Sequence, residues 1–355
     1  MANVRGFARL GTIAVGLGIG AAVAHSPVAS ADTSTDWLSA IDTLLAGGAF
    51  PALVTPALDY QISFDGYDLF PTTGNLATAS TAVGSFGLAI AVGDGADASA
   101  NSGIGNVAID IGNNTGTGGE TIADEGNGNV AIDIGDNSGV ANGVVADDGN
   151  GNFAIDVGNN SGVSDQVFAD DGNNNVAIGF GNNSGTSDAV FADEGNNNVA
   201  IGFGNNSGTS DAVFADEGNN NVAIGLGNNS GTSDAVFADE GNGNTAIAMG
   251  GNDSASADEG NGNFAEVIGP AGSSATAFGG NHDISYILDP FGSTASTADS
   301  GDGGNFDLAA VLLTDGSATA QGSDFLYDII SALGNESGAL PASLATLLTD
   351  LAALF

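Results

Sequence analysis

The sequence predicts an all-β fold, a β-solenoid whose two-strand coils resemble a β-roll. Two consecutive 23-residue segments, 175–197 and 198–220, are identical, and the next copy, 221–243, differs from them at two positions. Each copy contains a segment such as 176–180 (VAIGF), in which large and small residues alternate with the period of a β-strand. Repetition at a fixed period of roughly 20 to 50 residues is typical of stacked repeat architectures.

An Asn marks the start of each first strand and sets the repeat length, and from Asn106 to Asn244 these side chains are expected to bond along the stack to turn backbone groups. This Asn recurs every 23 residues from Asn106 to Asn244, and again 19 residues later at Asn263. With weaker copies on both sides, residues 60–322 are expected to form about twelve coils of 19 to 23 residues. Frequent glycines argue against a helical repeat, because each costs a helix about 1 kcal/mol. The Gly content and charge favour disorder, but the fixed placement of Val, Ile and Phe opposes it.

The first strand is expected to bury its large residues, such as Val176 and Ile178. The alternating positions carry Ala, Gly or, in three copies, Asp110, Asp133 and Asp156. An unpaired carboxylate is costly to bury. We therefore expect the Val, Ile and Phe positions to face the interior and the Ala, Asp and Gly positions to face solvent.

The second strand, Ala-Val-Phe-Ala, leaves two alternatives open. Shorter coils carry Ala-Ser-Ala or Ala-Thr-Ala there, as in 255–257, with a hydroxyl residue at the Phe position. If that register carries over, Val190 and Ala192 face inward. Alternatively, the four extra residues of the long coil reverse the register and bury the ring, which gains ~1.5–3 kcal/mol each. In the first case an outward row forms an interaction face that consists of Phe168, Phe191, Phe214 and Phe237.

The first 31 residues have the features of a secretory signal peptide. Arg5 and Arg9 precede an apolar run at 11–24 that is too short to span a bilayer, and 29–31 (Ala-Ser-Ala) fits a cleavage site. Secretion is therefore expected, although a retained anchor helix is the alternative. No transmembrane span is expected.

Helical caps are expected at both ends of the repeat region. In residues 32–59, Trp37, Ile41 and Leu44 fall on one face of a helix, and in residues 323–355 the apolar residues again follow a helical period. Solenoids need such caps to cover their last coils. A membrane or partner anchor is the alternative for the C-terminal segment.

The charge of the chain excludes several function classes. Its 355 residues include 43 acidic residues, two basic residues, and no cysteine, for a net charge of −41. Such a surface repels nucleic acid and anionic lipid, and a disulfide framework is excluded. His282 is the one histidine beyond the signal segment, so neither a catalytic triad nor a zinc site can be assembled. A polysaccharide-lyase-type site would need basic residues. We therefore expect no enzymatic activity and no organic cofactor.

A pair of acidic residues recurs in the turn after the second strand. Two like charges ~4.8 Å apart repel by ~0.9 kcal/mol even in water, so a stacked ladder is costly unless it is well solvated or binds cations. Carboxylate, Asn and carbonyl oxygens are suitable Ca²⁺ ligands. The alternatives are therefore a Ca²⁺-binding edge and a solvated acidic edge. The candidate metal-ligating residues are Asp124, Glu125, Asp147, Asp148, Asp170, Asp171, Asp193, Glu194, Asp216, Glu217, Asp239, Glu240, Asp258 and Glu259.

The short coils resemble a known family of surface proteins. Residues 88–98 follow the pattern x-A-I-A-x-G-x-x-A-x-A, which resembles the β-roll head repeats of trimeric autotransporter adhesins over much of residues 74–320. The Gly/Asn-rich repeats and the segment 26–32 (SPVASAD) are also similar to secreted mycobacterial repeat proteins. The resemblances imply a secreted or cell-surface role. With the lack of a catalytic constellation, we expect a non-enzymatic protein for adhesion or for envelope or host interaction. Its partner would be a surface protein or glycan, and self-association is a further expectation. The alternative function is a calcium-binding β-roll module.

Overall fold

The computed structural model describes most of the repeat region. The described residues are 59–69, 76–187, 189–205, 208–209, 212–227, 235–250, 253–269, 272–289, 295–301, 305–312, 316–320 and 327–331. The chain divides into two compact units, Met1–Pro56 and Ala57–Phe355, and all described residues belong to the second. The expected signal peptide (1–31), nearly all of the N-terminal cap (32–59) and most of the C-terminal cap (323–355) lie outside the described residues.

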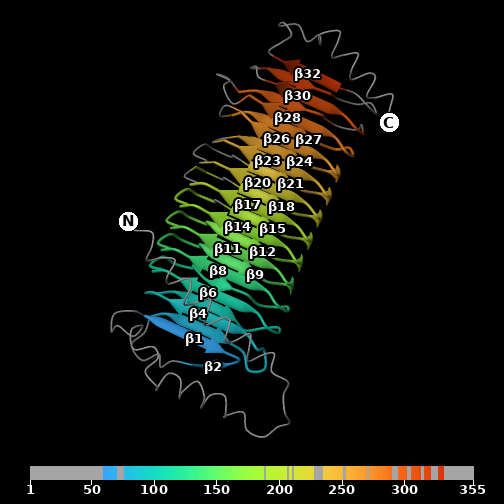
Figure 1. The fold of residues 1–355 in the computed structure, drawn as a ribbon. Coiled ribbons are helices and arrows are strands. Elements are labelled where there is room, and N and C mark those ends of the chain that lie inside the picture. Colours follow the sequence, from blue (N-terminus) through green and yellow to red (C-terminus); the bar gives the residue numbers. More distant parts are fainter. Residues whose placement is uncertain are drawn as a thin grey trace, which may run out of the picture. The chain divides into compact units, whose positions relative to one another are not determined.

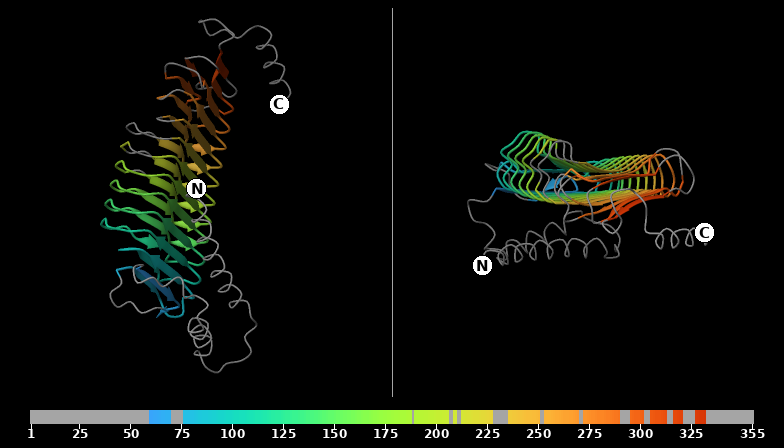
Figure 2. Two further views of the ribbon diagram at one scale, coloured as in Figure 1. Left: turned by 60° about the vertical axis from the view of Figure 1, so that its left-hand side comes forward. Right: turned by 90° about the horizontal axis from the view of Figure 1, so that it is seen from above.

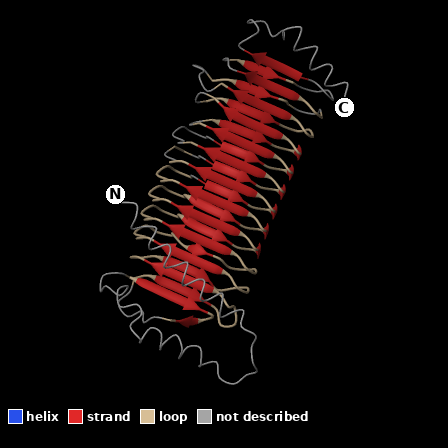
Figure 3. Cartoon of the chain, in the orientation of Figure 1, coloured by secondary structure: helices blue, strands red, loops and turns tan. Residues whose placement is uncertain are grey.

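The described residues form a parallel β-solenoid, which confirms the predicted fold class. Every regular element among them is a strand and none is a helix (Figure 3). Successive coils place equivalent strands side by side along the stack (Figures 1 and 2), and each strand pairs with its counterpart from the next coil. The in-register pairing puts each residue directly over its repeat equivalent, as in Val176 over Val199.

The first sheet has 14 strands and carries the Val-Ala-Ile segment of each coil. It begins with an antiparallel hairpin, because β2 pairs with β1 and β1 pairs antiparallel with β4; from β4 onward all pairs are parallel. In spatial order its strands are β2 (Tyr67–Asp68), β1 (Tyr60–Phe64), β4 (Leu88–Val92), β6 (Val107–Ile111), β8 (Val130–Ile134), β11 (Phe153–Val157), β14 (Val176–Phe180), β17 (Val199–Phe203), β20 (Val222–Leu226), β23 (Thr245–Met249), β26 (Phe264–Ile268), β28 (Ile284–Leu288), β30 (Leu308–Leu312) and β32 (Tyr327–Ser331).

The second sheet has 12 parallel strands and carries the Ala-Val-Phe-Ala segment. Its strands are β3 (Thr78–Thr81), β5 (Asp97–Ala100), β7 (Thr121–Ile122), β9 (Gly143–Ala146), β12 (Gln166–Ala169), β15 (Ala189–Ala192), β18 (Ala212–Ala215), β21 (Ala235–Ala238), β24 (Ser254–Ala257), β27 (Ser274–Ala277), β29 (Thr297–Asp299) and β31 (Ser317–Thr319).

A third sheet of six two-residue strands lies in the turn after the acidic pair, where the sequence predicted only a turn. Its strands are β10 (Gly149–Asn150), β13 (Gly172–Asn173), β16 (Gly195–Asn196), β19 (Gly218–Asn219), β22 (Gly241–Asn242) and β25 (Gly260–Asn261).

The interior between the two large sheets is narrow and filled mainly by small residues. Ala177 and Ala192, with their equivalents in most coils, are 0% exposed. The remaining space lies between one residue column of the first sheet and one of the second, and where the residue in one column is large the residue facing it is small. A Cβ on Gly202 of β17 would lie only 3.0 Å from Cγ2 of Val190 on β15, so a glycine faces a valine there. Farther along, the sizes reverse: Val267 and Ile287 occupy the glycine column, and Ala255 and Ala275 occupy the valine column.

The predicted orientation of the first strand is wrong. Ala177 and Gly179 face the interior, whereas Val176 and Ile178 are half-buried on the outer face and Phe180 is 37% exposed there. Asp110, Asp133 and Asp156 are therefore inside, with exposures of 0%, 2% and 1%. The physical reason is the width of the interior, which admits Ala and Gly but not a layer of Ile and Phe from both sheets. The outward Val and Ile residues are covered instead by their equivalents above and below.

The predicted C-terminal helix is also wrong where the structure describes that segment. Residues 327–331 form strand β32, which pairs in register with β30, so that Ile330 lies opposite Val311 in the strand register. Two adjacent isoleucines fit a helix face and a strand equally well, and the unpaired edge of β30 favours the strand. In the described part of the chain, no helix is long and apolar enough to cross a membrane.

Candidate functional site

The outer surface of the second sheet carries a ladder of four stacked phenylalanines, which we call the Phe ladder. Val190 is 4% exposed and Ala192 0%, while Phe191 between them points outward and is half-buried. This result confirms the register inferred from the short coils. Successive ring centroids lie 5.1, 4.9 and 5.1 Å apart, with interplanar angles of 28°, 10° and 1°. The ladder consists of Phe168, Phe191, Phe214 and Phe237.

The ladder ends at both sides with smaller residues. Val145 precedes Phe168 in the column, and Ser256 follows Phe237. A second, shorter stack that the sequence analysis missed lies on the outer face of the first sheet. Phe180 and Phe203 stack there at 4.9 Å and 3°, and they are 37% and 44% exposed.

Two residues after each ladder position, the chain enters the acidic turn. In the repeat 193–194, the amide of Glu194 donates to Oδ1 of Asp193 at 2.8 Å, and Glu194 adopts a left-handed backbone with φ of 36°. The other acidic pairs repeat this conformation, with positive φ at Glu125, Asp148 and Asp171 among others. The first member of each pair is half-buried and the second is exposed. The structure thus stacks all seven predicted pairs at one edge of the solenoid, which we call the acidic ladder.

The electrostatics of the acidic ladder are those of crowded like charges. Burial, together with the like charges of the neighbouring Asp193 and Asp147, raises the pKa of Asp170 to about 6. Asp216 has a pKa of about 6 for the same reasons. In one place the crowding brings three carboxylates together, because ligand oxygens of Asp148, Asp170 and Asp171 all lie within 4.8 Å of one another.

An outer ladder of half-buried and exposed Asn side chains runs beside the acidic pairs, and the sequence analysis did not identify it. The Nδ2 of each Asn donates to Oδ1 of its equivalent in the next coil, as from Asn173 to Asn196 and from Asn196 to Asn219, both at 2.9 Å. The Gly-Asn dipeptide after every acidic pair was the available signal. The ladder consists of Asn127, Asn150, Asn173, Asn196, Asn219, Asn242, Asn261, Asn281 and Asn305.

A buried Asn ladder supports this edge from inside. Asn198 is 0% exposed; its Nδ2 donates to the carbonyls of Asp193 at 2.8 Å and Gly218 at 3.2 Å, and its Oδ1 accepts the amide of Asn221 at 3.1 Å. The same bonds recur from Asn106 to Asn263. The expectation that these residues bond along the stack to turn backbone groups is confirmed. Because they hold the carbonyl of the acidic residue, they fix the turn that presents the carboxylates.

His282, in the described region, stacks on Phe306 at 5.1 Å, and the described residues include no Lys or Arg. What the surface offers is periodicity: an aromatic stripe, an acidic stripe and an amide stripe, each repeating once per coil. Searches against protein-family models, curated proteins and solved structures found no match.

Proposed function

We propose that this is a secreted or cell-surface, non-enzymatic protein that uses its repetitive outer surface for adhesion. The observation that carries the proposal is the Phe ladder, in which aromatic rings lie outside the core and only two residues from an acidic edge. The resemblance of residues 88–98 to adhesin head repeats, and the predicted signal peptide, agree with a role outside the cytoplasm.

The chemistry of the two stripes indicates the kind of partner. Aromatic residues are enriched at the cores of protein interfaces, and the stacked rings of the ladder expose their edges as a continuous apolar strip. The acidic ladder beside the strip would attract a partner with basic residues and repel an acidic one. The partner that fits best is therefore a surface protein with apolar residues flanked by Lys or Arg.

Binding of the labelled full chain to intact bacterial and epithelial cells tests the proposal. The variant replaces all four ladder phenylalanines by Ser, the residue that Ser256 provides in a neighbouring short coil. Phe203→Leu on the other sheet is the matched control, because Leu226 holds that position in the next coil. We expect the ladder variant to lose binding and the control to retain it. Equal binding by the ladder variant would contradict the role of the ladder, and absence of wild-type binding to both cell types would contradict adhesion.

Calcium binding at the acidic ladder is a second candidate, favoured by the close approach of Asp148, Asp170 and Asp171. Three carboxylates within 4.8 Å provide oxygen ligands at a surface turn. In calorimetric titration, the triple Asp→Asn variant at these positions should then bind fewer Ca²⁺ ions than wild type. Unchanged binding by this variant would reject the candidate.

A further inference from the structure

Three carboxylates lie in one column inside the solenoid and, unlike the half-buried or exposed acidic ladder, are fully buried. Asp110, Asp133 and Asp156 occupy the same position of β6, β8 and β11 and are paired in register. Their exposures are 0%, 2% and 1%. Since Arg5 and Arg9 are the only Lys or Arg residues of the chain, no basic side chain of the solenoid can neutralise them.

Each carboxylate has one satisfied and one unsatisfied oxygen. Oδ2 accepts the side-chain amide of the Asn four residues later, at 2.6 Å from Asn114 to Asp110, and Asn137 and Asn160 bind Asp133 and Asp156 in the same way. Oδ1 of all three Asp residues has no hydrogen-bond partner. A buried polar atom without a partner is costly, so a row of three requires an explanation.

Further unpartnered oxygens lie in the same coils. The amide oxygens of Asn137 and Asn160, each 2% exposed, have no partner. Neither has the hydroxyl of Thr121, which is 0% exposed. Two coils further along the stack, the strand register replaces Thr121 by Val167 and Asp133 by Gly179. Thr121 and Asp133 therefore have the same relative position as Val167 and Gly179.

The contact at Gly179 shows what this register means. A Cβ there would lie 3.0 Å from Cγ2 of Val167, so these two positions face each other across the interior. The side chain of Thr121 therefore faces Asp133. These coils thus contain six buried oxygens without a hydrogen-bond partner, of which only the Thr121 hydroxyl can itself donate.

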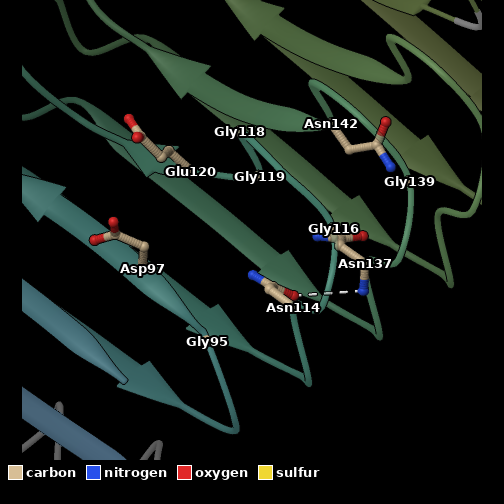
Figure 4. A pocket seen from close by; sticks show the side chains of 10 residues that line it. All are labelled: Gly95, Asp97, Asn114, Gly116, Gly118, Gly119, Glu120, Asn137, Gly139 and Asn142. Carbon is tan, nitrogen blue, oxygen red and sulfur yellow. Dashed lines mark hydrogen bonds between the residues drawn. The ribbon is translucent and has the colours of Figure 1, made fainter. Parts of the chain in front are cut away.

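A polar cavity lies beside the Asn residues that bind this column, although the three carboxylates are not among its lining residues. It has a volume of about 150 Å³, and its lining includes Asn114 and Asn137, the residues that bind Asp110 and Asp133, together with Asp97 and Glu120 (Figure 4). Glu120 is exposed, so the cavity reaches the surface and offers an entry path. It also provides room for water molecules that would complete a coordination shell.

The spacing of the coils selects the ligand. Neighbouring parallel strands lie ~4.8 Å apart, so a point midway between equivalent oxygens is ~2.4 Å from each. That distance lies within the ~2.3–2.6 Å range of Ca²⁺–oxygen bonds and exceeds the ~2.0–2.1 Å that Mg²⁺ requires. We propose that the Asp110–Asp133–Asp156 column is an interior Ca²⁺ site, in which Oδ1 atoms of successive coils and the Thr121 hydroxyl bind the ion and the cavity supplies water ligands.

Protons are the competing way to neutralise the column. Burial and the like charges of Asp156 and Asp110 raise the pKa of Asp133 well above its ordinary value, and burial raises the pKa of Asp110 to about 7. A proton on Oδ1, however, would be a buried donor that itself needs an acceptor, and no hydrogen bond joins the neighbouring carboxyls. A cation satisfies the oxygens on both sides of each gap at once.

The next coils supply a design for the test, because they place Gly179, Gly202 and Gly225 in the same column and still form the same strands. The proposal is independent of the acidic ladder and of adhesion. Three chains are compared after removal of metal by a chelator: wild type, Asp133→Asn, and the exposed-turn variant with Asn at 148, 170 and 171. Asp133→Gly serves as a second interior variant if Asp133→Asn does not fold.

Calorimetric titration with Ca²⁺ and thermal unfolding with and without millimolar Ca²⁺ are the readouts. We expect Ca²⁺ to raise the melting temperature of wild type and of the exposed-turn variant. In Asp133→Asn we expect the affinity to fall by at least ~10-fold and the temperature shift to vanish, since ligand charge sets Ca²⁺ affinity. An equal response of Asp133→Asn and wild type would overturn the proposal. So would absence of any Ca²⁺ response in wild type, which would leave protonation as the explanation of the column.

Discussion

Replacing Gly202 by Ala tests the size complementarity that sets the orientation of every coil. The new Cβ would lie 3.0 Å from Cγ2 of Val190 and 3.8 Å from Cγ2 of Val213. Carbon atoms in contact normally lie ~3.5–4.0 Å apart, so Val190 would have to move by about 0.5 Å in a close-packed interior. Overpacking costs ~1–3 kcal/mol, and the lower entropy of the unfolded chain offsets ~0.4–1 kcal/mol of it. We expect a net loss of about 1–2 kcal/mol in the free energy of unfolding.

The double variant Gly202→Ala/Val190→Ala separates overpacking from other effects. Val190→Ala alone should be destabilising because it leaves a cavity. Combined, the two changes should cost less than the sum of their separate effects by about 1 kcal/mol or more, because the new methyl group enters the space that Val190 leaves. Urea unfolding followed by circular dichroism gives the cycle. Additive effects, or a Gly202→Ala chain as stable as wild type, would refute the proposed facing of these two columns.

Other perturbations give distinct outcomes. In a metal-free chain, burial raises the pKa of Asp110 to about 7 and of Asp156 to about 6. The folded state therefore binds protons more tightly than the unfolded state, so the free energy of unfolding should fall as the pH rises from about 4 to 7. The midpoint of urea unfolding measures this change. A rise over that range would contradict the buried column. Asn198→Ala removes three hydrogen bonds of a fully buried side chain and should cost about 3 kcal/mol, whereas Asn196→Ala, on the half-buried outer Asn ladder, should cost under about 1 kcal/mol in the same assay; similar losses would contradict the distinction. Phe214→Ser removes a half-buried, stacked ring and should cost about 1–2 kcal/mol without altering the circular dichroism spectrum; a change in the spectrum would show that the ring belongs to the core.

The repeat period and the outward Phe ladder could be predicted because the sequence contains its own controls. Asn recurs at a fixed distance, and the short coils carry residues such as Ser256 at the position of Phe191, which made the outward register one of the two alternatives that the sequence left open. The Asn residues that open each first strand could be assigned a structural role because an amide can bond both along the stack and to the turn. These features depend on local chemistry that repeats from coil to coil.

The facing of the first strand could not be obtained by the same reasoning, because it depends on the distance between the two sheets. The cost of burying Asp133 was weighed alone, while its pairing with Asn137 and the narrowness of the interior were not. A signal was present: Ala177 and its equivalents remain Ala in nearly every coil, which is typical of a tightly confined interior position. The strand β32 was missed because a pair of isoleucines does not distinguish a helix from an edge strand.

In-register stacking places identical residues of successive coils next to each other. This contact stabilises some columns and destabilises others. Asn gains a hydrogen bond and Phe gains a ring contact from each added coil, so these ladders can extend indefinitely. A buried Asp gains a like charge instead. The interior column accordingly carries Asp in three coils only and changes to Gly at Gly179, within the first of the identical units. Since coils with Gly in that column form the same strands with the same Asn and Phe ladders, the coil does not require Asp110, Asp133 or Asp156 for its geometry. The interior Ca²⁺ site proposed above would account for their presence in three consecutive coils.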